Sequence, residues 1–204
     1  RPAWEIDVAD GGQAADEHAK RPSSTLEALL RRVEEGLSPA RTVVYDHGSL
    51  ATAAIRGLSG PDPAGFIFMT DFGSIGLSLA ASIGAALSRP DRTTVCVIGD
   101  GAMMMSLAEL DTLARLNTEV LVLVLNDGAY GAEQPLLAHL GASVSIASFD
   151  SAPIADIAAG IGVPSVVVAA PYDLGAVDSF LQRSGPRVLE IVCEPPLRPG
   201  EVAR

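Results

Sequence analysis

Short runs of consecutive apolar residues recur along the chain and alternate with segments whose apolar residues return every three or four positions. The clearest run is VLVLVL at residues 120–125. An unbroken apolar run of this length is typical of a strand buried on both faces of a sheet. By this criterion we predict strands at residues 42–45, 66–69, 94–98, 120–125, 165–169 and 187–192. The helical pattern predicts helices at residues 49–57, 75–87, 103–116, 133–140, 154–160 and 174–183.

Strands that alternate with helices favour βα units with right-handed connections. The sequence therefore predicts an α/β fold, with a doubly wound, mainly parallel six-stranded sheet and helices on both faces. In such a sheet, ligands bind beyond the carboxyl ends of the strands. Four loops at those ends are rich in Gly, Asp or Asn, namely residues 46–49, 70–76, 99–102 and 126–131. We expect the chemistry to lie there.

The two ends of the chain depart from this pattern. Residues 1–24 are polar and irregular, and Ser24 or Thr25 would cap a short amphipathic helix that ends before Pro39. The apolar positions of that helix are Leu26, Leu29, Leu30 and Val33. We therefore divide the chain into an arm with a short helix at residues 1–40, a ligand-binding domain at 41–194 and an extended, proline-rich tail at 195–204. Because no Met precedes Arg1, we expect the chain to be a piece of a longer protein.

Composition narrows the classes of partner. The 204 residues suffice for a full core. One explanation for a hydrophobic fraction of 48% against 19% charged residues is a face that meets a partner. A net charge of −11 argues against nucleic acid, which needs a basic surface. The apolar stretches are too short to cross a membrane, so we expect a cytoplasmic protein. Cys96 and Cys193 are isolated and are interpreted as free thiols in a reducing compartment.

Two acidic motifs carry the candidate chemistry. Gly99-Asp100-Gly101 follows one predicted strand and opens a helix, and Asn126-Asp127-Gly128 follows the next strand. The glycines let the backbone approach a ligand, and a helix N-terminus offers N–H groups to an anion. The Asp100 carboxylate would repel a phosphate unless a divalent metal lay between them, and Asp127 adds a second oxygen ligand suited to Mg²⁺. Either motif alone also fits a tight turn, with Asp100 as a helix cap.

Together, the two motifs resemble a known family. Gly99-Asp100-Gly101 followed by Asn126-Asp127 is similar to the thiamine diphosphate motif, which is Gly-Asp-Gly followed by Asn-Asn or a variant. The stretch GSIGLSLAASIGA at residues 73–85 resembles the turn and helix that precede this motif in the acetolactate synthase, pyruvate decarboxylase and pyruvate oxidase group. The resemblance covers roughly residues 40–195, so residues 41–194 would bind the diphosphate end of thiamine diphosphate.

The resemblance implies how the metal and the diphosphate are held. Mg²⁺ would be bound by the side chains of Asp100 and Asp127 and by the carbonyl of Ala129. Asp127 stands where a second Asn is more usual, which makes the site more anionic. The diphosphate would be bound by backbone groups of Gly101, Ala102, Gly131 and Ala132. Ala102 replaces a frequent Ser, which removes one hydroxyl contact. The resemblance also assigns Ser74, Gly99 and Tyr130 to the cofactor site.

Other positions would contact the reacting end of the cofactor. Ile75 matches a bulky apolar residue that forces the bent cofactor conformation, in which the 4′-amino group reaches the thiazolium C2 carbon, although an ordinary core isoleucine is the alternative. Gly73 would offer its carbonyl to the same amino group. Met103 would either line the pyrimidine pocket or, as we favour, fill the core. His47 would face the diphosphate or the substrate, with a surface role nearly as well supported.

One component of the family's active site is not expected in this chain. A glutamate that activates the pyrimidine ring comes from a different, pyrimidine-binding domain, and the segment before residue 41 is too short to be one. We therefore expect a catalytically incomplete part of a 2-oxo-acid decarboxylase or carboligase, in a homo- or hetero-oligomer. A domain of a longer enzyme is favoured over one subunit of a split, sulfopyruvate-type decarboxylase. The alternatives are a non-catalytic cofactor-binding module and a flavodoxin-like module that binds Mg²⁺ without thiamine.

Overall fold

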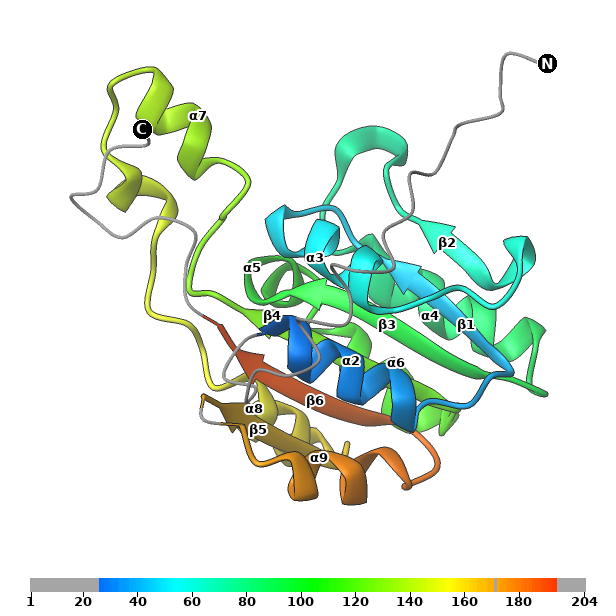
Figure 1. Cartoon of the computed structure of the whole chain (residues 1–204). Coiled ribbons are helices and arrows are strands. Elements are labelled where there is room, and N and C mark those ends of the chain that lie inside the picture. The colour runs from blue at the N-terminus through cyan, green and yellow to red at the C-terminus, as the bar shows by residue number, and fades with distance from the viewer. Residues whose placement is uncertain (1–25, 171, 194–204) are drawn as a thin grey trace, which may run out of the picture.

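The computed structural model describes residues 26–170 and 172–193, which form one α/β unit around a six-stranded sheet (Figure 1). The strand order is β2-β1-β3-β4-β6-β5, and every neighbouring pair is parallel. The strands are β1 (Arg41–Tyr45), β2 (Phe66–Phe68), β3 (Thr93–Gly99), β4 (Val120–Asn126), β5 (Ser165–Ala169) and β6 (Arg187–Val192). The predicted doubly wound fold is confirmed, with a sheet that is parallel throughout rather than mainly parallel.

Helices connect the strands, and most lie where the apolar spacing predicts them. They are α2 (Leu26–Gly36), α3 (Ser49–Gly57), α4 (Leu77–Ser88), α5 (Asp100–Met105), α6 (Glu109–Leu116), α7 (Gln134–His139), α8 (Ile154–Ile161) and α9 (Leu174–Leu181). The short 3₁₀ turns η1 (Pro63–Gly65), η2 (Asp71–Gly73) and η3 (Val144–Ala147) follow no apolar pattern, so the sequence does not predict them.

The prediction of one continuous helix at residues 103–116 is wrong, because the chain turns between α5 and α6. The Ser106 hydroxyl donates to the carbonyls of Ala102 and Met103 at 3.3 Å each, and the Ser106 N–H bonds the Met103 carbonyl at 3.1 Å. Side-chain bonds of this kind compete with the helical backbone ladder. The helix predicted at residues 75–87 starts two residues later because Gly76 has a left-handed backbone, with φ +92°.

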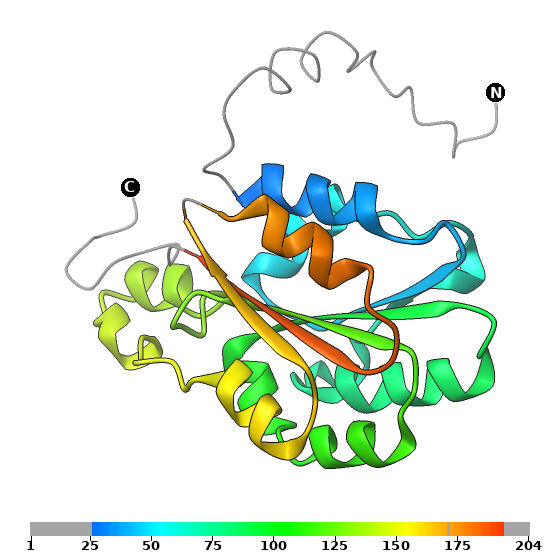
Figure 2. The same ribbon diagram turned by 90° about the horizontal axis from the view of Figure 1, so that it is seen from below.

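Both faces of the sheet are covered by helices. Successive residues of a strand point to opposite faces, and Val95 and Val97 of β3 accordingly pack with α2, α3 and α9, whereas Cys96 and Ile98 pack with α4, α5, α6 and α8. Figure 2 shows α2 and α9 on one face and α4, α6 and α8 on the other. Burial on both faces explains why the strands are unbroken apolar runs in the sequence.

The predicted short helix is present as α2, and it packs into the core through the fully buried side chains of Leu29, Leu30 and Val33. Its proposed caps Ser24 and Thr25 lie outside the described residues, as do the rest of the arm before Leu26 and the tail at 195–204. The division of the chain into arm, domain and tail therefore stays a prediction. No helix in the described part of the chain combines the length and the hydrophobicity that crossing a membrane requires.

The connection from β4 to α8, residues 127–153, extends away from the body of the sheet and carries α7 and η3 (Figure 1). We call it the β4–α8 connection. At its base, an isolated antiparallel bridge joins Ala129 to Ser148. The Tyr130 N–H donates to the Ala147 carbonyl at 2.9 Å, and the Phe149 N–H donates to the Gly128 carbonyl at 2.8 Å. These bonds hold the two sides of the connection together where it leaves the sheet.

Candidate functional site

The carboxyl ends of β3 and β4 bring Asp100 and Asp127 together. Asp100 is the first residue of α5 and Asp127 directly follows β4, with exposed fractions of 1% and 6%. Asp100 Oδ1 and Asp127 Oδ2 are buried, and no group in the described part of the chain donates a hydrogen bond to either atom. Buried oxygens without a partner are rare in native proteins and call for a ligand, a water or an ion.

The proximity of the two carboxylates changes their acidity. Burial raises the pKa of Asp127 to about 7, and the charge of the neighbouring Asp100 contributes to this rise. Burial also raises the pKa of Asp100, although the nearby Ser151 hydroxyl and backbone N–H groups oppose this shift. Two buried carboxylates at close range are unfavourable unless a proton or a cation lies between them. The arrangement therefore favours a bound cation.

The loop that presents Asp127, residues 126–129, is shaped by its own hydrogen bonds, and we call it the β4 loop. Gly128 has φ +63°, and its N–H lies 3.2 Å from both Asp100 Oδ2 and Asn126 Oδ1. A Cβ at Gly128 would lie 3.0 Å from the Phe149 carbonyl oxygen. This position requires glycine both for its backbone conformation and for its space.

Ala129 is oriented by the bridge to Ser148. The hydrogen bonds of that bridge are made by Gly128 and Tyr130, so the N–H and C=O of Ala129 itself point to the opposite side. The Ala129 N–H donates to Asp127 Oδ1 at 3.2 Å. Because the two groups of an extended residue point the same way, the Ala129 carbonyl is directed toward the side where Asp127 lies. The Ala129 carbonyl oxygen thus faces the side of the loop on which the Asp127 carboxylate lies.

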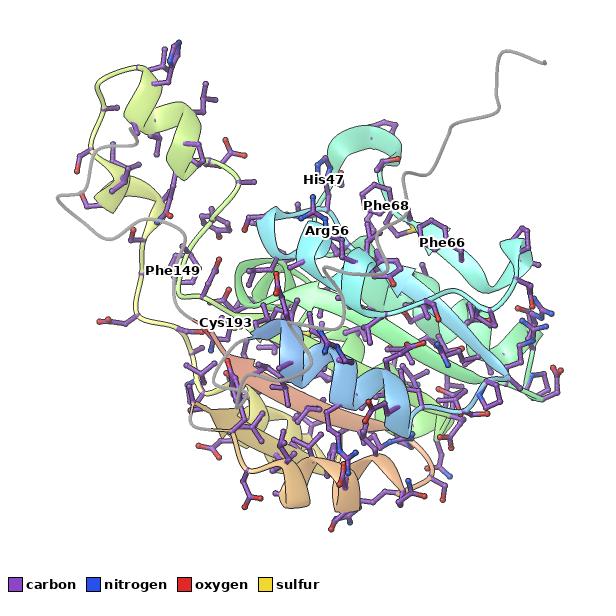
Figure 3. The ribbon with its side chains drawn as sticks, viewed as in Figure 1. His47, Arg56, Phe66, Phe68, Phe149 and Cys193 are labelled. Atoms are coloured by element: carbon purple, nitrogen blue, oxygen red, sulfur yellow. The ribbon has the colours of Figure 1, made fainter. Side chains whose placement is uncertain are left out.

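A close backbone approach also occurs at the start of α5. A Cβ at Gly101 would lie 2.6 Å from the Tyr130 ring and 3.3 Å from Phe149. The rings of Tyr130 and Phe149 contact each other with centroids 5.1 Å apart. Figure 3 shows Phe149 at the base of the β4–α8 connection. Only glycine at position 101 leaves room between α5 and this aromatic pair.

The opposite side of the site is organised by Asp46, which directly follows β1 and is 2% exposed. Its carboxylate accepts the Gly76 N–H at 3.1 and 2.9 Å and the Ser78 N–H at 3.1 Å. It also accepts the His47 N–H at 2.9 Å. Helix α4 has no side-chain cap of its own, because Gly76 occupies that position. Asp46 therefore caps α4 from another strand and fixes the turn that contains Ile75.

A cleft runs between these two sides, and ten of the predicted site residues line it. They are His47, Ile75, Gly99, Gly101, Ala102, Asp127, Ala129, Tyr130, Gly131 and Ala132. His47 is exposed at the end of the sheet, with its ring centroid 6.0 Å from that of Phe68 (Figure 3). The cleft thus brings the side formed by Asp100 and Asp127 together with the side organised by Asp46, at the carboxyl ends of β1, β3 and β4.

Four predicted site residues do not line the cleft. Asp100 lies buried beside Asp127, and Gly73 and Ser74 lie in the turn before Ile75. Met103 is fully buried in the core between the sheet and α5, which fits a core side chain rather than a pocket residue.

Two buried carboxylates of this region are not singled out by the sequence. The sequence places Asp46 in a loop beside His47, and it places Glu190 within a predicted strand. Glu190 is 3% exposed and bonds Asn126, the first residue of the β4 loop, at 2.6 Å. An acidic residue inside an otherwise apolar strand is the signal that marks Glu190, because charged groups are rarely buried without a partner.

The two carboxylates and the Ala129 carbonyl fit one divalent cation whose remaining coordination positions are filled by a bound ligand. In the described ranges, no group of three or more His, Cys, Asp or Glu side chains is placed to hold a metal. Two carboxylates and one carbonyl leave coordination positions open, as is usual for Mg²⁺, which keeps waters and binds substrate phosphates. Gly99, Gly101 and Ala102, at the start of α5, line the cleft beside these oxygens.

Comparison with known proteins is consistent with this chemistry. The model of the family described as "Thiamine pyrophosphate enzyme, C-terminal TPP binding domain" matches residues 46–191. The protein IlvB2 of Mycobacterium tuberculosis, assigned as an acetolactate synthase large subunit, is 30% identical over 176 residues, covering 85% of this chain and 32% of that protein. An alpha-keto-acid decarboxylase of Mycobacterium ulcerans is 30% identical over 158 residues, covering 76% and 27% of the two chains.

Among solved structures, an assigned thiamin diphosphate-dependent enzyme of Mycobacterium smegmatis superposes with a TM-score of 0.69 at 27% identity. The match covers 85% of this chain and 32% of that one. This chain therefore spans about a third of the length of the proteins that it resembles. A synthase and a decarboxylase both match it at 30% identity, so the similarity does not select one reaction.

Proposed function

This chain belongs to the family of thiamine pyrophosphate (TPP) enzymes, as their C-terminal TPP-binding domain. We therefore propose that its cleft binds thiamine diphosphate, which is another name for TPP, through a Mg²⁺ ion. The observation that carries the proposal is the pair of buried, partnerless oxygens, Asp100 Oδ1 and Asp127 Oδ2. A divalent cation neutralises both carboxylates and attracts the diphosphate that they would otherwise repel.

The ligands of the ion are the Asp100 and Asp127 side chains and the Ala129 carbonyl. The backbone amides of Gly101 and Ala102, at the start of α5, would donate hydrogen bonds to the diphosphate, and backbone groups of Gly131 and Ala132 would add further contacts. Gly99 directly precedes these two residues, and the Tyr130 ring packs against Gly101. An aspartate at position 127 gives the ion a second full negative charge, which strengthens metal binding.

The other wall of the cleft contacts the reacting end of the cofactor. Ile75 lines the cleft and would support the bent conformation of the cofactor, and Gly73, two residues earlier in the turn, would offer its carbonyl to the 4′-amino group. Ser74 joins these two residues, and His47 lies at the mouth of the cleft, toward the substrate. Bound thiamine diphosphate supplies a nucleophilic carbon and an electron sink for cleaving or forming a bond next to a carbonyl group. The residues of this chain bind and orient that cofactor.

The whole reaction is decarboxylation or carboligation of a small 2-oxo acid, and it requires a second domain or subunit that supplies the activating glutamate. Exposed apolar residues beside the cleft support such a partner. Phe72 is 101% exposed, and Leu77 and Met105 are 44% and 59% exposed. Apolar groups gathered in this way mark interaction surfaces. We place the assembly, a homo- or hetero-oligomer, in the cytoplasm, with this chain as part of a longer enzyme rather than a subunit of a split one.

Calorimetric titration tests the proposal. Thiamine diphosphate and Mg²⁺ together should bind the chain, alone or with its partner domain, whereas either one without the other should bind at least about tenfold more weakly. Asp127→Ala should abolish the metal-dependent part of binding. Asp111→Ala, at an exposed position on α6, is the matched control and should bind as the unmodified chain does.

Equal affinity of the Asp127→Ala and unmodified chains for the metal and cofactor would show that the metal site is misplaced. Absence of binding by the assembled protein would contradict the proposed function itself. Turnover of a 2-oxo-acid panel by the assembly then separates an enzyme from a non-catalytic cofactor-binding module.

A further inference from the structure

Glu190 is a buried carboxylate with two well-defined partners. It lies in β6, next to β4 in the sheet, and is 3% exposed. Its Oε1 accepts the Asn126 side-chain amide at 2.6 Å, and its Oε2 accepts the Ala155 N–H at 2.9 Å. Each oxygen therefore bonds a different segment of the chain.

The two segments are the two ends of the β4–α8 connection. Asn126 is the last residue of β4, and Ala155 lies in the first turn of α8. Helix α8 has no side-chain cap of its own, since Pro153 occupies that position, and Glu190 satisfies one of its free N–H groups. A single carboxylate thus joins the point where the connection leaves the sheet to the point where it returns.

Asn126 in turn connects Glu190 to Asp100 and Asp127, which we call the acidic pair. Asn126 Oδ1 accepts the Gly128 N–H at 3.2 Å, and that N–H also lies 3.2 Å from Asp100 Oδ2. With its amide group turned toward Glu190, Asn126 can present only its oxygen to Gly128. The orientation of Asn126, and with it the backbone of the β4 loop, is therefore set by Glu190.

We propose that Glu190 is a positioning residue for the β4 loop, which it holds in the conformation that brings the Asp127 carboxylate to Asp100. Glu190 does not line the cleft, and its two oxygens are engaged by Asn126 and Ala155 rather than by the acidic pair. The identity of the ion between the carboxylates rests on the proposed function, whereas the conformation of the loop does not.

The donors and acceptors around Glu190 explain why glutamine cannot replace it. In Glu190→Gln, the side-chain oxygen would accept the Ala155 N–H and the side-chain NH₂ group would turn toward the Asn126 NH₂ group, so that two donors face each other. Rotating the Asn126 amide removes this conflict but turns its NH₂ group toward the Gly128 N–H. The Gly128 N–H then keeps Asp100 Oδ2 as an acceptor at 3.2 Å, but in each arrangement one side-chain NH₂ group faces another donor, and an unsatisfied buried donor is costly.

Exchanging the amide of Asn126 and the carboxylate of Glu190 restores the pairing of donors with acceptors. In the double variant Asn126→Asp with Glu190→Gln, the glutamine amide donates to the aspartate, whose second oxygen accepts the Gly128 N–H. The glutamine oxygen still accepts the Ala155 N–H. The net charge of the protein is unchanged.

Glu119 provides a matched control. Its carboxylate also bonds one side chain and one backbone amide, Arg187 at 2.6 Å and Gly185 at 2.6 Å. It precedes β4 and so lies at the opposite end of the sheet from the acidic pair. Glu119→Gln reports what the loss of a carboxylate of this kind does to stability alone.

Backbone hydrogen exchange in the full chain without ligand is the first measurement. Glu190→Gln should speed exchange at Gly128 and Ala155 by about tenfold or more relative to the rest of β4. Glu119→Gln should leave both amides unchanged, and the double variant should return them to the rate of the unmodified chain. Equal exchange in Glu190→Gln and the unmodified chain would overturn the proposal.

The second measurement is Mn²⁺ binding in the presence of thiamine diphosphate, followed by electron paramagnetic resonance. Glu190→Gln should weaken Mn²⁺ binding by about 10- to 100-fold, the usual effect of removing a group that orients a metal ligand, and Glu119→Gln should not. Unchanged Mn²⁺ affinity in Glu190→Gln would also overturn the proposal. If the unmodified chain binds no Mn²⁺, the proposed function fails, and the exchange rates alone decide the role of Glu190.

Discussion

The carboxylate of Asp46 holds the backbone N–H of Gly76 with both of its oxygens, at 3.1 and 2.9 Å, across 30 residues of sequence. This contact fixes the turn before α4 to the end of β1. Ile75 directly precedes Gly76, so its position over the cleft depends on the same carboxylate. One wall of the site is therefore held in place by a residue that the apolar pattern does not reveal.

Replacing Asp46 by Asn should destabilise the protein and weaken cofactor binding. An amide has one acceptor oxygen, whereas Asp46 uses two for the buried N–H groups of Gly76 and Ser78 and the partly buried N–H of His47. At least one donor therefore loses its partner, at a cost of about 1–3 kcal/mol. Urea unfolding measures the loss. Asp173→Asn is the control, because Asp173 caps α9 through one oxygen only and Asn is an equally good cap. A similar loss in both variants would show that the second oxygen of Asp46 is unimportant.

The stability of the ligand-free chain should fall as pH rises from about 4 to about 7. Asp127 has a pKa of about 7 in the folded state, because it is buried beside Asp100, whereas an unfolded aspartate titrates near 4. Between these values the folded state binds more protons than the unfolded state, so its advantage is lost as pH increases through this range. Unfolding at pH 5 and pH 8 checks the sign, and Asp127→Asn should remove this part of the pH dependence.

With Mg²⁺ bound, the stability of the chain should rise rather than fall over this pH range, because the ion binds the ionised carboxylates. With a pKa of about 7, only about a tenth of Asp127 is ionised at pH 6, so metal affinity should be about tenfold weaker there than at pH 8. Isothermal titration of Mg²⁺ with saturating thiamine diphosphate measures the difference. An affinity that stays constant from pH 6 to pH 8 would contradict both the raised pKa and the placement of the ion.

Gly128→Ala should destabilise the chain and reduce metal affinity, because position 128 combines φ +63° with a carbonyl oxygen 3.0 Å from the added methyl. Strain of this kind costs about 1–3 kcal/mol. Gly84→Ala is the matched control. Gly84 lies inside α4 with nothing within 4 Å of an added Cβ, and alanine there should stabilise the helix by about 0.5–1 kcal/mol. Thermal unfolding of the two variants should therefore shift in opposite directions.

The sequence predicts the fold and the acidic pair because both leave local signals. Unbroken apolar runs mark the buried strands, and Asp100 and Asp127 directly follow two of them. The sequence does not reveal the turn at Ser106, because its side-chain bonds to Ala102 and Met103 interrupt the helix without interrupting the apolar spacing.

The two buried carboxylates that support the site could not be assigned partners from the sequence. Asp46 caps a helix 30 residues later, and Glu190 bonds an amide 64 residues earlier. Neither helix start carries a capping residue of its own, as Gly76 and Pro153 occupy those positions. An uncapped helix predicts that some partner exists, but only the order of the strands in the sheet determines which residue supplies it.

The β4–α8 connection has a fixed base and an outward-facing tip. Its base is held by the Glu190 carboxylate and the bridge between Ala129 and Ser148, whereas Leu136, Leu140 and Ile146 near its tip are 53%, 69% and 74% exposed. Exchanging residues 133–146 for the equivalent stretch of a relative leaves every one of these base contacts in place. The segment is accordingly suited to loop grafting, in which the tip is exchanged while the contacts that orient Asp100 and Asp127 are kept.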